Sequence, residues 1–300
     1  MSTIDRRNFM GRAAGVAAGL AAASELQATE IPSTPPPPPL VPLGSTGIEL
    51  SRVGQGTGVH GGNRQSNQTR MGFEKLVALF RHSYDRGIRF FDLADLYGSH
   101  IYFREALRSI PREEVAILTK IWWRYDGPEE QASSSERKQI VQATLERFRH
   151  ELATDYLDIV LLHCMQKASW DQSLEPYMEV LEEAKTKGQV RAVGVSCHDF
   201  GALETASVSP WVDVILARFN PQGVKMDGTP EQIAQVLRTA KKNGKAVIGM
   251  KIFGEGQLVD QRKECIQFAQ SSGVLDAMTI GLDNPEQVDD LLHLIHQYPS

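Results

Sequence analysis

The chain has 300 residues, of which 41% are hydrophobic and 23% are charged, and its formal net charge at pH 7 is −5. This length predicts one or two domains, and the composition is ordinary for a soluble globular protein. Nothing in the charge balance suggests a nucleic-acid partner. The three cysteines are too few and too scattered for a disulfide framework.

The first 28 residues resemble a twin-arginine (Tat) export signal. Arg6 and Arg7 precede a weakly apolar, alanine-rich run over 13–23, and small residues lie near Ala23 and Ala28. Such leaders direct a protein out of the bacterial cytoplasm and are then removed. The resemblance implies that the Tat export machinery is a partner and that the mature chain is periplasmic or otherwise extracytoplasmic. The alternative is an amphipathic helix or a membrane anchor. Because the run is shorter than the ~20 residues that a spanning helix needs, we expect no permanent membrane span.

A proline-rich linker, residues 29–40, is expected between this leader and the folded domain, residues 41–300. Residues 35–39 are all proline, which favours an extended polyproline II spacer without hydrogen bonds to the core. Residues 43–50 follow, and their glycine-containing pattern predicts the turn of a small hairpin.

Short apolar runs then alternate with amphipathic stretches, the pattern of repeated βα units. Glycines after several amphipathic stretches fit helix ends. The predicted strands are 51–56, 90–93, 115–120, 156–163, 192–196, 212–219, 246–250 and 277–281. The predicted helices are 73–86, 139–152, 174–187, 230–243, 262–271 and 285–297.

Eight such units favour an α/β fold of the (β/α)8 TIM-barrel type over a doubly wound, two-domain fold. The doubly wound alternative also lacks its phosphate-binding motif. Residues 54–58 read GQGTG, which is rich in glycine but is not the GxGxxG of a strand-to-helix turn. This segment is expected to be a flexible loop after the first barrel strand.

Four side chains with acid–base chemistry lie at or just beyond the ends of three predicted strands. Asp92 lies near the end of the second strand, Tyr97 follows that strand, Lys120 ends the third and His163 ends the fourth. Strand ends that face one mouth are where a (β/α)8 barrel assembles its active site. An acid, a phenol, an amine and an imidazole are the groups that proton-coupled carbonyl reduction requires, and no metal is needed.

The chemistry assigns a role to each group. A free phenol has a pKa of about 10 and is a weak acid near neutral pH. We expect Lys120 to lower the pKa of Tyr97, which would make Tyr97 the proton donor. Asp92 would keep the amine of Lys120 charged and oriented. His163 would hydrogen-bond the carbonyl oxygen of the substrate and align it.

These residues lie in segments that resemble the aldo-keto reductase superfamily. The segments are FDLADLYG, the TK followed by IWW, and LLHC, and the resemblance covers roughly residues 40–295. It implies a (β/α)8 barrel, plugged at its N-terminal end by a hairpin, that transfers a hydride from a nicotinamide cofactor to an aldehyde or ketone. The catalytic tetrad of the family corresponds to Asp92, Tyr97, Lys120 and His163.

The resemblance also implies that NAD(P)H binds across the later strand ends. Two of the matching positions differ from the usual family pattern: Cys197 replaces an asparagine, and Met250 replaces an aromatic residue. The residues expected to contact the cofactor are Thr57, Ser196, Cys197, Met250, Lys251, Phe253, Gly254, Gly281, Asp283 and Gln287.

Residues 279–287 bear on the choice between the two cofactors. Relatives that prefer NADPH carry a lysine and an arginine here for the 2′-phosphate, and this chain has neither. Asp283 would repel that phosphate while accepting hydrogen bonds from ribose hydroxyls. The sequence therefore favours NAD(H), unless a basic residue from another loop supplies the charge.

The substrate pocket is expected to include Trp122 and His60. An aromatic wall favours an apolar or ring-bearing carbonyl compound, and sugar-derived substrates stay open as well. The oligomeric state is left open.

Three alternatives to this interpretation stay open. A nicotinamide-binding redox sensor or regulatory barrel with little turnover would use the same cofactor site. A metal-assisted barrel hydrolase or isomerase would use His163, His198 and Asp92 as ligands. Cys164 and Cys197 could form a redox pair, although two small buried residues beside the active site are the simpler interpretation.

Overall fold

The computed structural model describes residues 34–126 and 132–299. The predicted export signal, residues 1–28, lies outside the described residues, as does the first part of the predicted linker. Within the described part of the chain, no helix has both the length and the apolar character needed to cross a membrane.

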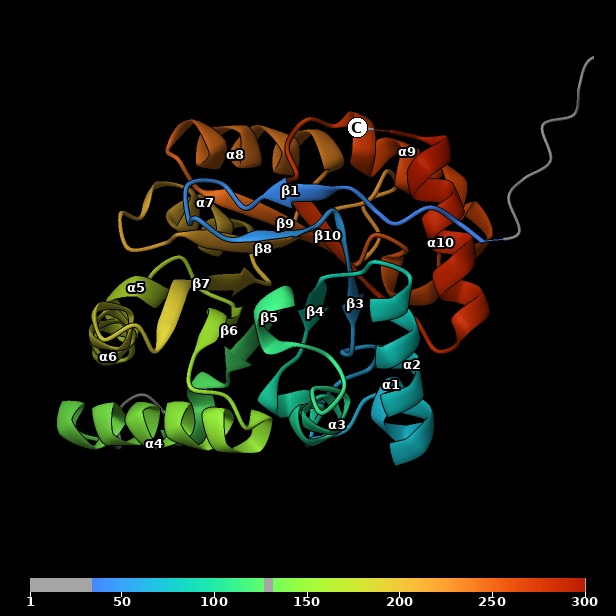
Figure 1. The fold of residues 1–300 in the computed structure, drawn as a ribbon. Helices are drawn as coiled ribbons and strands as arrows, with labels where there is room; N and C mark the ends of the chain where they lie inside the picture. Colours follow the sequence, from blue (N-terminus) through green and yellow to red (C-terminus); the bar gives the residue numbers. More distant parts are fainter. Residues whose placement is uncertain (1–33, 127–131, 300) are drawn as a thin grey trace, which may run out of the picture. The chain divides into compact units, whose positions relative to one another are not determined.

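Eight parallel strands close into one barrel, and the last strand pairs with the first (Figure 1). This confirms the predicted (β/α)8 fold. The barrel strands are β3 (Val53–Gly56), β4 (Phe90–Asp92), β5 (Ala116–Ile121), β6 (Leu157–Met165), β7 (Val190–Cys197), β8 (Val214–Arg218), β9 (Ala246–Met250) and β10 (Ala277–Gly281).

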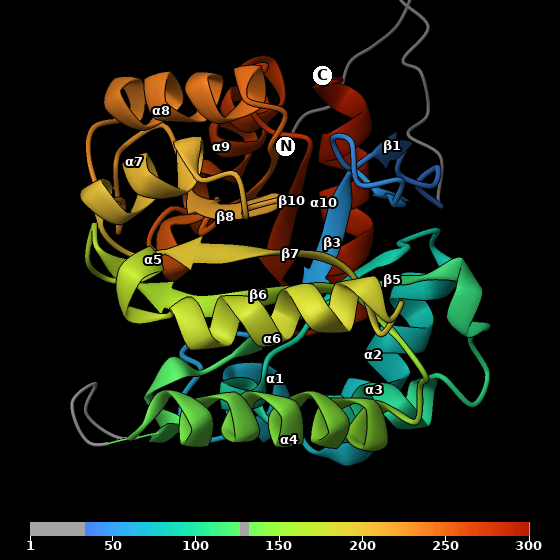
Figure 2. The ribbon, with the colours of Figure 1, turned by 90° about the vertical axis from the view of Figure 1, so that its left-hand side faces the viewer.

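Helices surround the strands, as the two ribbon views show (Figures 1 and 2). They are α1 (Asn67–Arg70), α2 (Phe73–Asp85), α3 (His100–Ala106), α4 (Ser134–Leu152), α5 (Trp170–Ser173), α6 (Glu175–Thr186), α7 (Phe200–Val208), α8 (Pro230–Lys242), α9 (Arg262–Ser271) and α10 (Pro285–Gln297).

Two hydrophobic clusters follow from the alternation of side chains along each strand. One fills the barrel interior, and the other lies between the strands and the helices. In β7, Ala192 belongs to the inner cluster, whereas Val193, Val195 and Cys197 belong to the outer one. This alternation decides which residues of a strand can reach the mouth of the barrel.

A two-stranded hairpin closes the N-terminal end of the barrel, as predicted. Strands β1 (Leu40–Pro42) and β2 (Glu49–Ser51) pair antiparallel. Leu43, Ile48 and Leu50 of this hairpin are buried in the inner cluster with residues from the starts of the barrel strands. Because the hairpin covers the N-terminal end of the barrel, an active site is expected at the C-terminal end.

Four helices and some helix and strand limits differ from the prediction. Helices α1 and α5 were not predicted because each has four residues. Helices α3 and α7 were not predicted either: α3 has seven residues, and the buried face of α7 carries mostly small side chains. Helix α4 begins before residue 139 because Ser133 and Glu136 form a capping box, in which each side chain accepts a hydrogen bond from the other's backbone N–H. Strand β6 continues past His163 through an irregular pairing with β7.

The proline-rich segment was predicted to be a spacer without hydrogen bonds to the core, and from residue 34 onward the structure shows otherwise. Pro35 and Pro38 are buried. The backbone N–H of Arg52 donates to the carbonyl of Pro39 over 2.8 Å, and His296 Nε2 of α10 donates to the carbonyl of Pro37 over 2.9 Å. Proline lacks an N–H, but its carbonyl still accepts, and these acceptors attach the segment to the barrel.

Candidate active site

The structure brings the four predicted catalytic side chains together at the C-terminal end of the barrel. Asp92 ends β4, Lys120 lies next to the end of β5, and His163 lies near the end of β6. Tyr97 ends a short 3-10 helix, η1 (Asp95–Tyr97), which directly follows β4.

Lys120 and Asp92 form a buried ion pair. Lys120 is 1% exposed and Asp92 is 6% exposed. The ammonium donates to Asp92 Oδ1 and, over 3.0 Å, to the carbonyl of Leu93. The other carboxylate oxygen of Asp92 accepts from Thr279 Oγ1 of β10 over 3.0 Å. Because each buried charge has a partner and further hydrogen bonds, the pair is held in one geometry.

Tyr97 and His163 form the second half of the site. The hydroxyl of Tyr97 lies 3.2 Å from His163 Nε2, within hydrogen-bond distance. The Lys120 Nζ atom lies 4.8 Å from the centre of the Tyr97 ring. His163 Nδ1 is buried and makes no hydrogen bond with any described residue. The phenol of Tyr97 therefore lies next to both the imidazole of His163 and the ammonium of Lys120.

The pKa of Tyr97 is raised well above its usual value, opposite to the direction predicted from the sequence. Burial is the main cause, followed by the negative charge of Asp92. Together these effects outweigh the ammonium of Lys120, which is bound directly to Asp92. Burial, together with the positive charge of Lys120, lowers the pKa of His163 well below 6.5. Both groups are therefore neutral near pH 7.

Glycines on the loop after β3 make room for the Tyr97 ring. A Cβ atom on Gly58 would lie 2.5 Å from Tyr97 Cζ, and one on Gly61 would lie 2.4 Å from Tyr97 Cδ1. Neither distance is tolerable for a side chain. The glycine-rich loop, expected to be flexible, thus has a packing function against the phenol.

A cleft of about 670 Å³ extends from Asp92 and Tyr97 past the ends of β9 and β10 to the start of α10. This volume is in the range of ligand sites. Most residues predicted to contact the cofactor or substrate line it, namely His60, Met250, Lys251, Phe253, Gly281, Asp283 and Gln287.

The start of α10 gives the far end of the cleft its polar character. Asn284 caps the helix by accepting from the Gln287 backbone N–H over 2.9 Å, and Asp283 accepts from Gln68 Nε2 over 2.8 Å. The partial positive charge of a helix N-terminus suits a phosphate, and a carboxylate suits ribose hydroxyls. The residues present therefore fit a nicotinamide dinucleotide.

Four residues predicted to contact the cofactor do not line this cleft. Thr57 is buried and donates to the carbonyl of Asp92 over 2.8 Å, so it fixes the end of β4. Ser196 Oγ accepts from the backbone N–H of Cys164 over 2.8 Å. Cys197 lies in the outer cluster, because neighbouring residues of a strand face opposite sides. Gly254 is buried next to Val224.

Trp122 lies beside His163, with ring centres 5.9 Å apart in an edge-on arrangement. It also lines a smaller, adjoining cavity with Arg64 and Arg147 rather than the main cleft. Trp122 is thus close enough to His163 to bound a substrate on that side.

The remaining candidate groups are separate from this arrangement. All three cysteines are free, so Cys164 and Cys197 form no disulfide. Cys164 Sγ lies 3.6 Å from His198 Nε2, and burial raises the pKa of Cys164 to about 11. Among the described residues, no three His, Cys, Asp or Glu side chains gather as a metal-binding set would.

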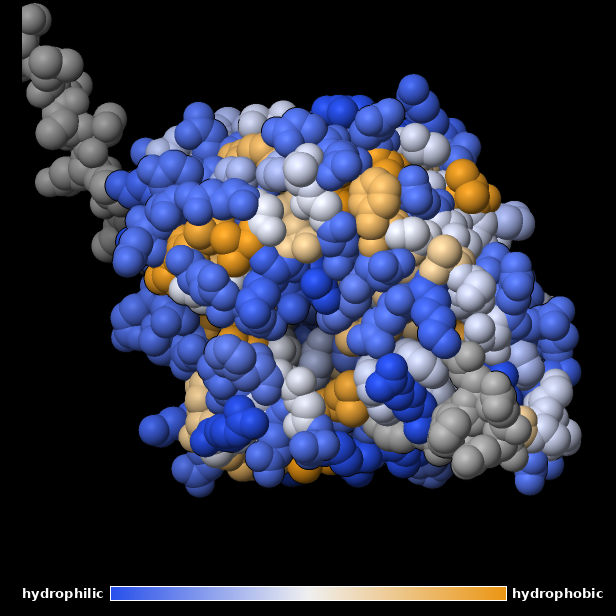
Figure 3. Space-filling model, turned by 180° about the vertical axis from the view of Figure 1, so that it is seen from behind, coloured by the Kyte–Doolittle hydropathy of each residue, from blue (hydrophilic) through white to orange (hydrophobic). Residues whose placement is uncertain are grey.

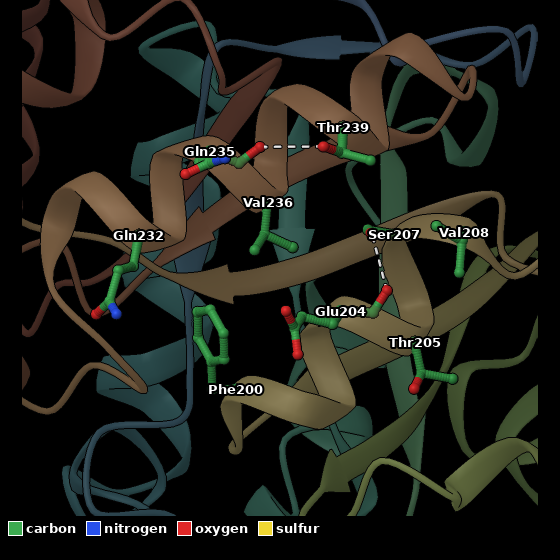
Figure 4. Close-up of a pocket in the computed structure, with 9 residues that line it drawn as sticks. All are labelled: Phe200, Glu204, Thr205, Ser207, Val208, Gln232, Gln235, Val236 and Thr239. Carbon is green, nitrogen blue, oxygen red and sulfur yellow. Dashed lines mark hydrogen bonds between the residues drawn. The ribbon is translucent and has the colours of Figure 1, made fainter.

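A second groove, of about 640 Å³, lies between α7 and α8 (Figure 4). Two of its hydroxyls bond within their own helices, Ser207 to the carbonyl of Glu204 over 2.7 Å and Thr239 to the carbonyl of Gln235 over 3.3 Å. The third, Thr205, donates to the carbonyl of Ala168 over 2.8 Å. Glu204 is its one titratable lining residue.

The face in Figure 3 is mainly hydrophilic, with hydrophobic residues in small separate groups. The candidate active site is therefore the cleft at the strand ends.

Sequence reasoning missed Thr279, Gly58 and Ser99. Ser99 accepts from Thr57 Oγ1 over 3.0 Å. The sequence contains a signal for Thr279. In a closed eight-stranded barrel the last strand lies beside the first, so a polar residue of the last strand near the mouth can face the site.

The chain is similar to known proteins in sequence and in fold. The aldo/keto reductase family profile matches residues 52–291, well over half of the chain. L-galactose dehydrogenase of Arabidopsis thaliana is 30% identical over 227 residues, which cover 73% of this chain and 66% of the plant protein. NADH-specific methylglyoxal reductase of Escherichia coli K12 is 28% identical over 195 residues, 60% of this chain and 58% of that protein. The chain thus spans less than two thirds of the length of these relatives.

The fold is shared with a solved structure, aldo-keto reductase AKR11C1 from Bacillus halodurans. The TM-score is 0.67 at 17% sequence identity, and the match covers 87% of this chain and 92% of that one. At this identity the likeness concerns the fold alone.

Proposed function

Because the chain belongs to the aldo/keto reductase family, we propose that it reduces an aldehyde or ketone to an alcohol with NAD(P)H, and that Tyr97 is the proton donor. The observation that carries this proposal is the contact of 3.2 Å between the Tyr97 hydroxyl and His163 Nε2. It lies directly beside the buried Lys120–Asp92 pair. A proton donor, an orienting imidazole and a fixed positive charge are thereby combined.

The residues of the chain manage the proton and the charge, and a bound nicotinamide supplies the hydride. A carbonyl oxygen that enters between Tyr97 and His163 is oriented by hydrogen bonds from both. The hydroxyl of Tyr97 then gives its proton to that oxygen as negative charge develops there.

Lys120 acts on the phenolate that this transfer leaves. Its ammonium is 4.8 Å from the ring centre and stabilises negative charge on the ring. The raised pKa of Tyr97 keeps the phenol protonated before the reaction, so the lysine contributes where charge forms rather than in the resting state. Asp92 holds the ammonium in position.

NAD(H) is the preferred cofactor in this proposal. The carboxylates among the described lining residues outnumber the basic side chains, which disfavours a 2′-phosphate. Arg262, at the start of α9, could accept this phosphate, but its Nε is bound to Asp290 Oδ2 at 2.7 Å. Lys251 is likewise paired with Glu255 at 2.9 Å. The carboxylates are Asp92, Glu255, Asp283, Glu286 and Asp290.

The substrate is a small carbonyl compound in this account. The relatives named above include a methylglyoxal reductase and an L-galactose dehydrogenase, so a dicarbonyl and a sugar are the first compounds to test. Trp122 beside His163 suits either a ring-bearing compound or the apolar face of a sugar.

Export by the twin-arginine pathway is a separate proposal. It is supported by Arg6 and Arg7 before the alanine-rich run. Replacing both arginines by lysine and fractionating the bacterial cell tests it. The proposal predicts that the native chain is recovered outside the cytoplasm and the variant inside it. Equal recovery in both compartments would contradict it.

A nicotinamide-binding sensor with little turnover is the second candidate. It would bind the cofactor in the same cleft and would differ from the reductase only in the proton-transfer step. Titration of the protein with NADH and NADPH, followed by turnover on a panel of aldehydes and ketones, separates the two. Tighter binding of NADH with turnover supports the reductase, and tight binding without turnover supports the sensor.

A further inference from the structure

We propose that Arg147 and Asp95 are positioning residues, and that their ion pair, the Arg147–Asp95 clamp, holds Tyr97 in place from the side away from the cleft. The inference rests on the proposed function, since it concerns the residue assigned there as the proton donor. Neither residue lines the main cleft. Both line the smaller cavity beside Trp122.

Asp95 is fixed by charge. It is fully buried, and it begins η1, the three-residue helix that ends at Tyr97. Arg147 of α4 donates one hydrogen bond to each carboxylate oxygen, both over 2.8 Å. Such a bidentate pair sets direction as well as distance. With only one residue between Asp95 and Tyr97, fixing the carboxylate restricts the backbone that carries the phenol.

Arg147 is oriented in turn by Glu151, one helical turn further along α4. Its Nη1 atom donates to Glu151 Oε1 over 3.0 Å. Burial alone would raise the pKa of Glu151, but hydrogen bonds from His100 and Arg64 outweigh it and lower the pKa to about 2. Glu151 is therefore charged at neutral pH and holds the guanidinium in place.

The same network continues to the strand that carries Lys120. His100 Nδ1 lies 2.8 Å from Glu151 Oε2, and His100 Nε2 lies 2.8 Å from Thr119 Oγ1. Thr119 directly precedes Lys120 in β5. Helix α4 thus connects through polar contacts both to η1, which carries Tyr97, and to the residue before the lysine.

Arg64 is the weaker member of this network. Its side chain is 50% exposed, against 34% for Arg147, and its Nη1 approaches one oxygen of Asp95, at 3.0 Å. A half-exposed guanidinium with a single contact to the carboxylate contributes less than a less exposed, bidentate one. Removal of Arg147 should therefore loosen η1 even though Arg64 stays.

The test compares Arg147→Met, Arg147→Lys and a matched control, Lys138→Met. Lys138 also lies on α4 and pairs with Glu179 at the surface, so this control removes a cation and an ion pair away from Tyr97. For each variant, kcat, KM, the Kd for NADH and the melting temperature are measured. The pKa of Tyr97 is followed by NMR of ring-labelled tyrosine, and its signal is assigned by its absence in Tyr97→Phe.

The proposal predicts that Arg147→Met lowers kcat on the order of 10- to 100-fold while the Kd for NADH stays unchanged. The pKa of Tyr97 should fall towards its ordinary value, because a loosened ring is less buried. Arg147→Lys, which keeps the charge but loses the bidentate geometry, should be intermediate, and Lys138→Met should behave as the native protein.

Unchanged kcat and an unchanged Tyr97 signal in Arg147→Met would overturn the proposal. If Arg147→Met does not fold, Arg147→Lys decides by the same two measurements. If the native protein turns over no carbonyl compound, the proposed function is refuted. The clamp is then tested by the NMR signal of Tyr97 alone, and an unchanged signal in Arg147→Met overturns it.

Discussion

Thr279 donates a hydrogen bond to Asp92 over 3.0 Å, although the two residues are 187 positions apart in the chain. Thr279 lies in β10, the last strand of the barrel, and Asp92 ends β4. The second oxygen of the same carboxylate is paired with Lys120. Closure of the barrel therefore completes the catalytic arrangement.

Thr279→Val should impair both stability and turnover, because the shape is kept while one buried oxygen of Asp92 loses its donor. We expect a loss of about 1–3 kcal/mol in the free energy of unfolding and a lower kcat. Thr279→Ser keeps the hydroxyl and is the control. Denaturant unfolding and steady-state kinetics check this, and equal stability of the valine and serine variants would contradict it.

Lys120→Met should abolish turnover and destabilise the protein, since it leaves the carboxylate of Asp92 buried without a cation. The expected cost is about 3–5 kcal/mol. Adding Asp92→Asn should restore part of the stability but none of the activity, because the uncompensated charge is gone. Melting temperatures of the two single variants and the double variant test this. Strictly additive losses would show that the two residues are not coupled.

Gly58→Ala should reduce kcat by displacing the phenol, because the new Cβ would lie 2.5 Å from Tyr97 Cζ. The loss should be on the order of 100-fold if the hydroxyl moves by about 1 Å. Gly62→Ala is the matched control on the same loop, since a Cβ there has no atom within 4 Å. Steady-state kinetics decide, and the prediction fails if both variants keep native kcat.

The protein should lose stability as the pH is lowered, and His198 should account for part of this loss. Burial, followed by the positive charges of Arg218 and Lys251, lowers its pKa from 6.5 to about 3. As the pH falls from 6.5 towards 3, the unfolded chain takes up a proton that the folded chain refuses, so the folded state loses stability. One such proton contributes up to about 1.4 kcal/mol per pH unit.

His198→Gln removes this contribution, so the stability of the variant should decrease less steeply as the pH is lowered. The buried carboxylates should account for the decrease that stays. Urea unfolding of both proteins at pH 7, 6 and 5 measures the slopes. Parallel slopes would mean that His198 titrates normally in the folded state.

Much of this architecture was predictable because it depends on local pattern. The apolar runs predicted all eight barrel strands, and polar residues at three strand ends predicted Asp92, Tyr97, Lys120 and His163. Cys197 differs from the prediction because the two-residue alternation along the strand turns it towards the helices. The alternation within β7 (Val190–Cys197) is visible in the sequence and is sufficient for the correct assignment of Cys197.

Other features depend on packing that no local pattern contains. The direction of the Tyr97 pKa follows from its burial and from the direct pairing of Lys120 with Asp92, and both arise only in the closed barrel. The clamp between Asp95 and Arg147 joins residues on separate elements. Thr57 was predicted to contact the cofactor, yet its hydroxyl donates to the carbonyl of Asp92.

The central claim is that Tyr97 donates the proton, and the most direct test is turnover of Tyr97→Phe beside the native protein, with NADH and NADPH, on a panel of aldehydes and ketones. We predict that the native protein reduces at least one compound and that the variant loses this activity while its Kd for the cofactor stays nearly the same. Native turnover by the variant would contradict the role of Tyr97. Absence of cofactor binding by both proteins would contradict the reductase itself.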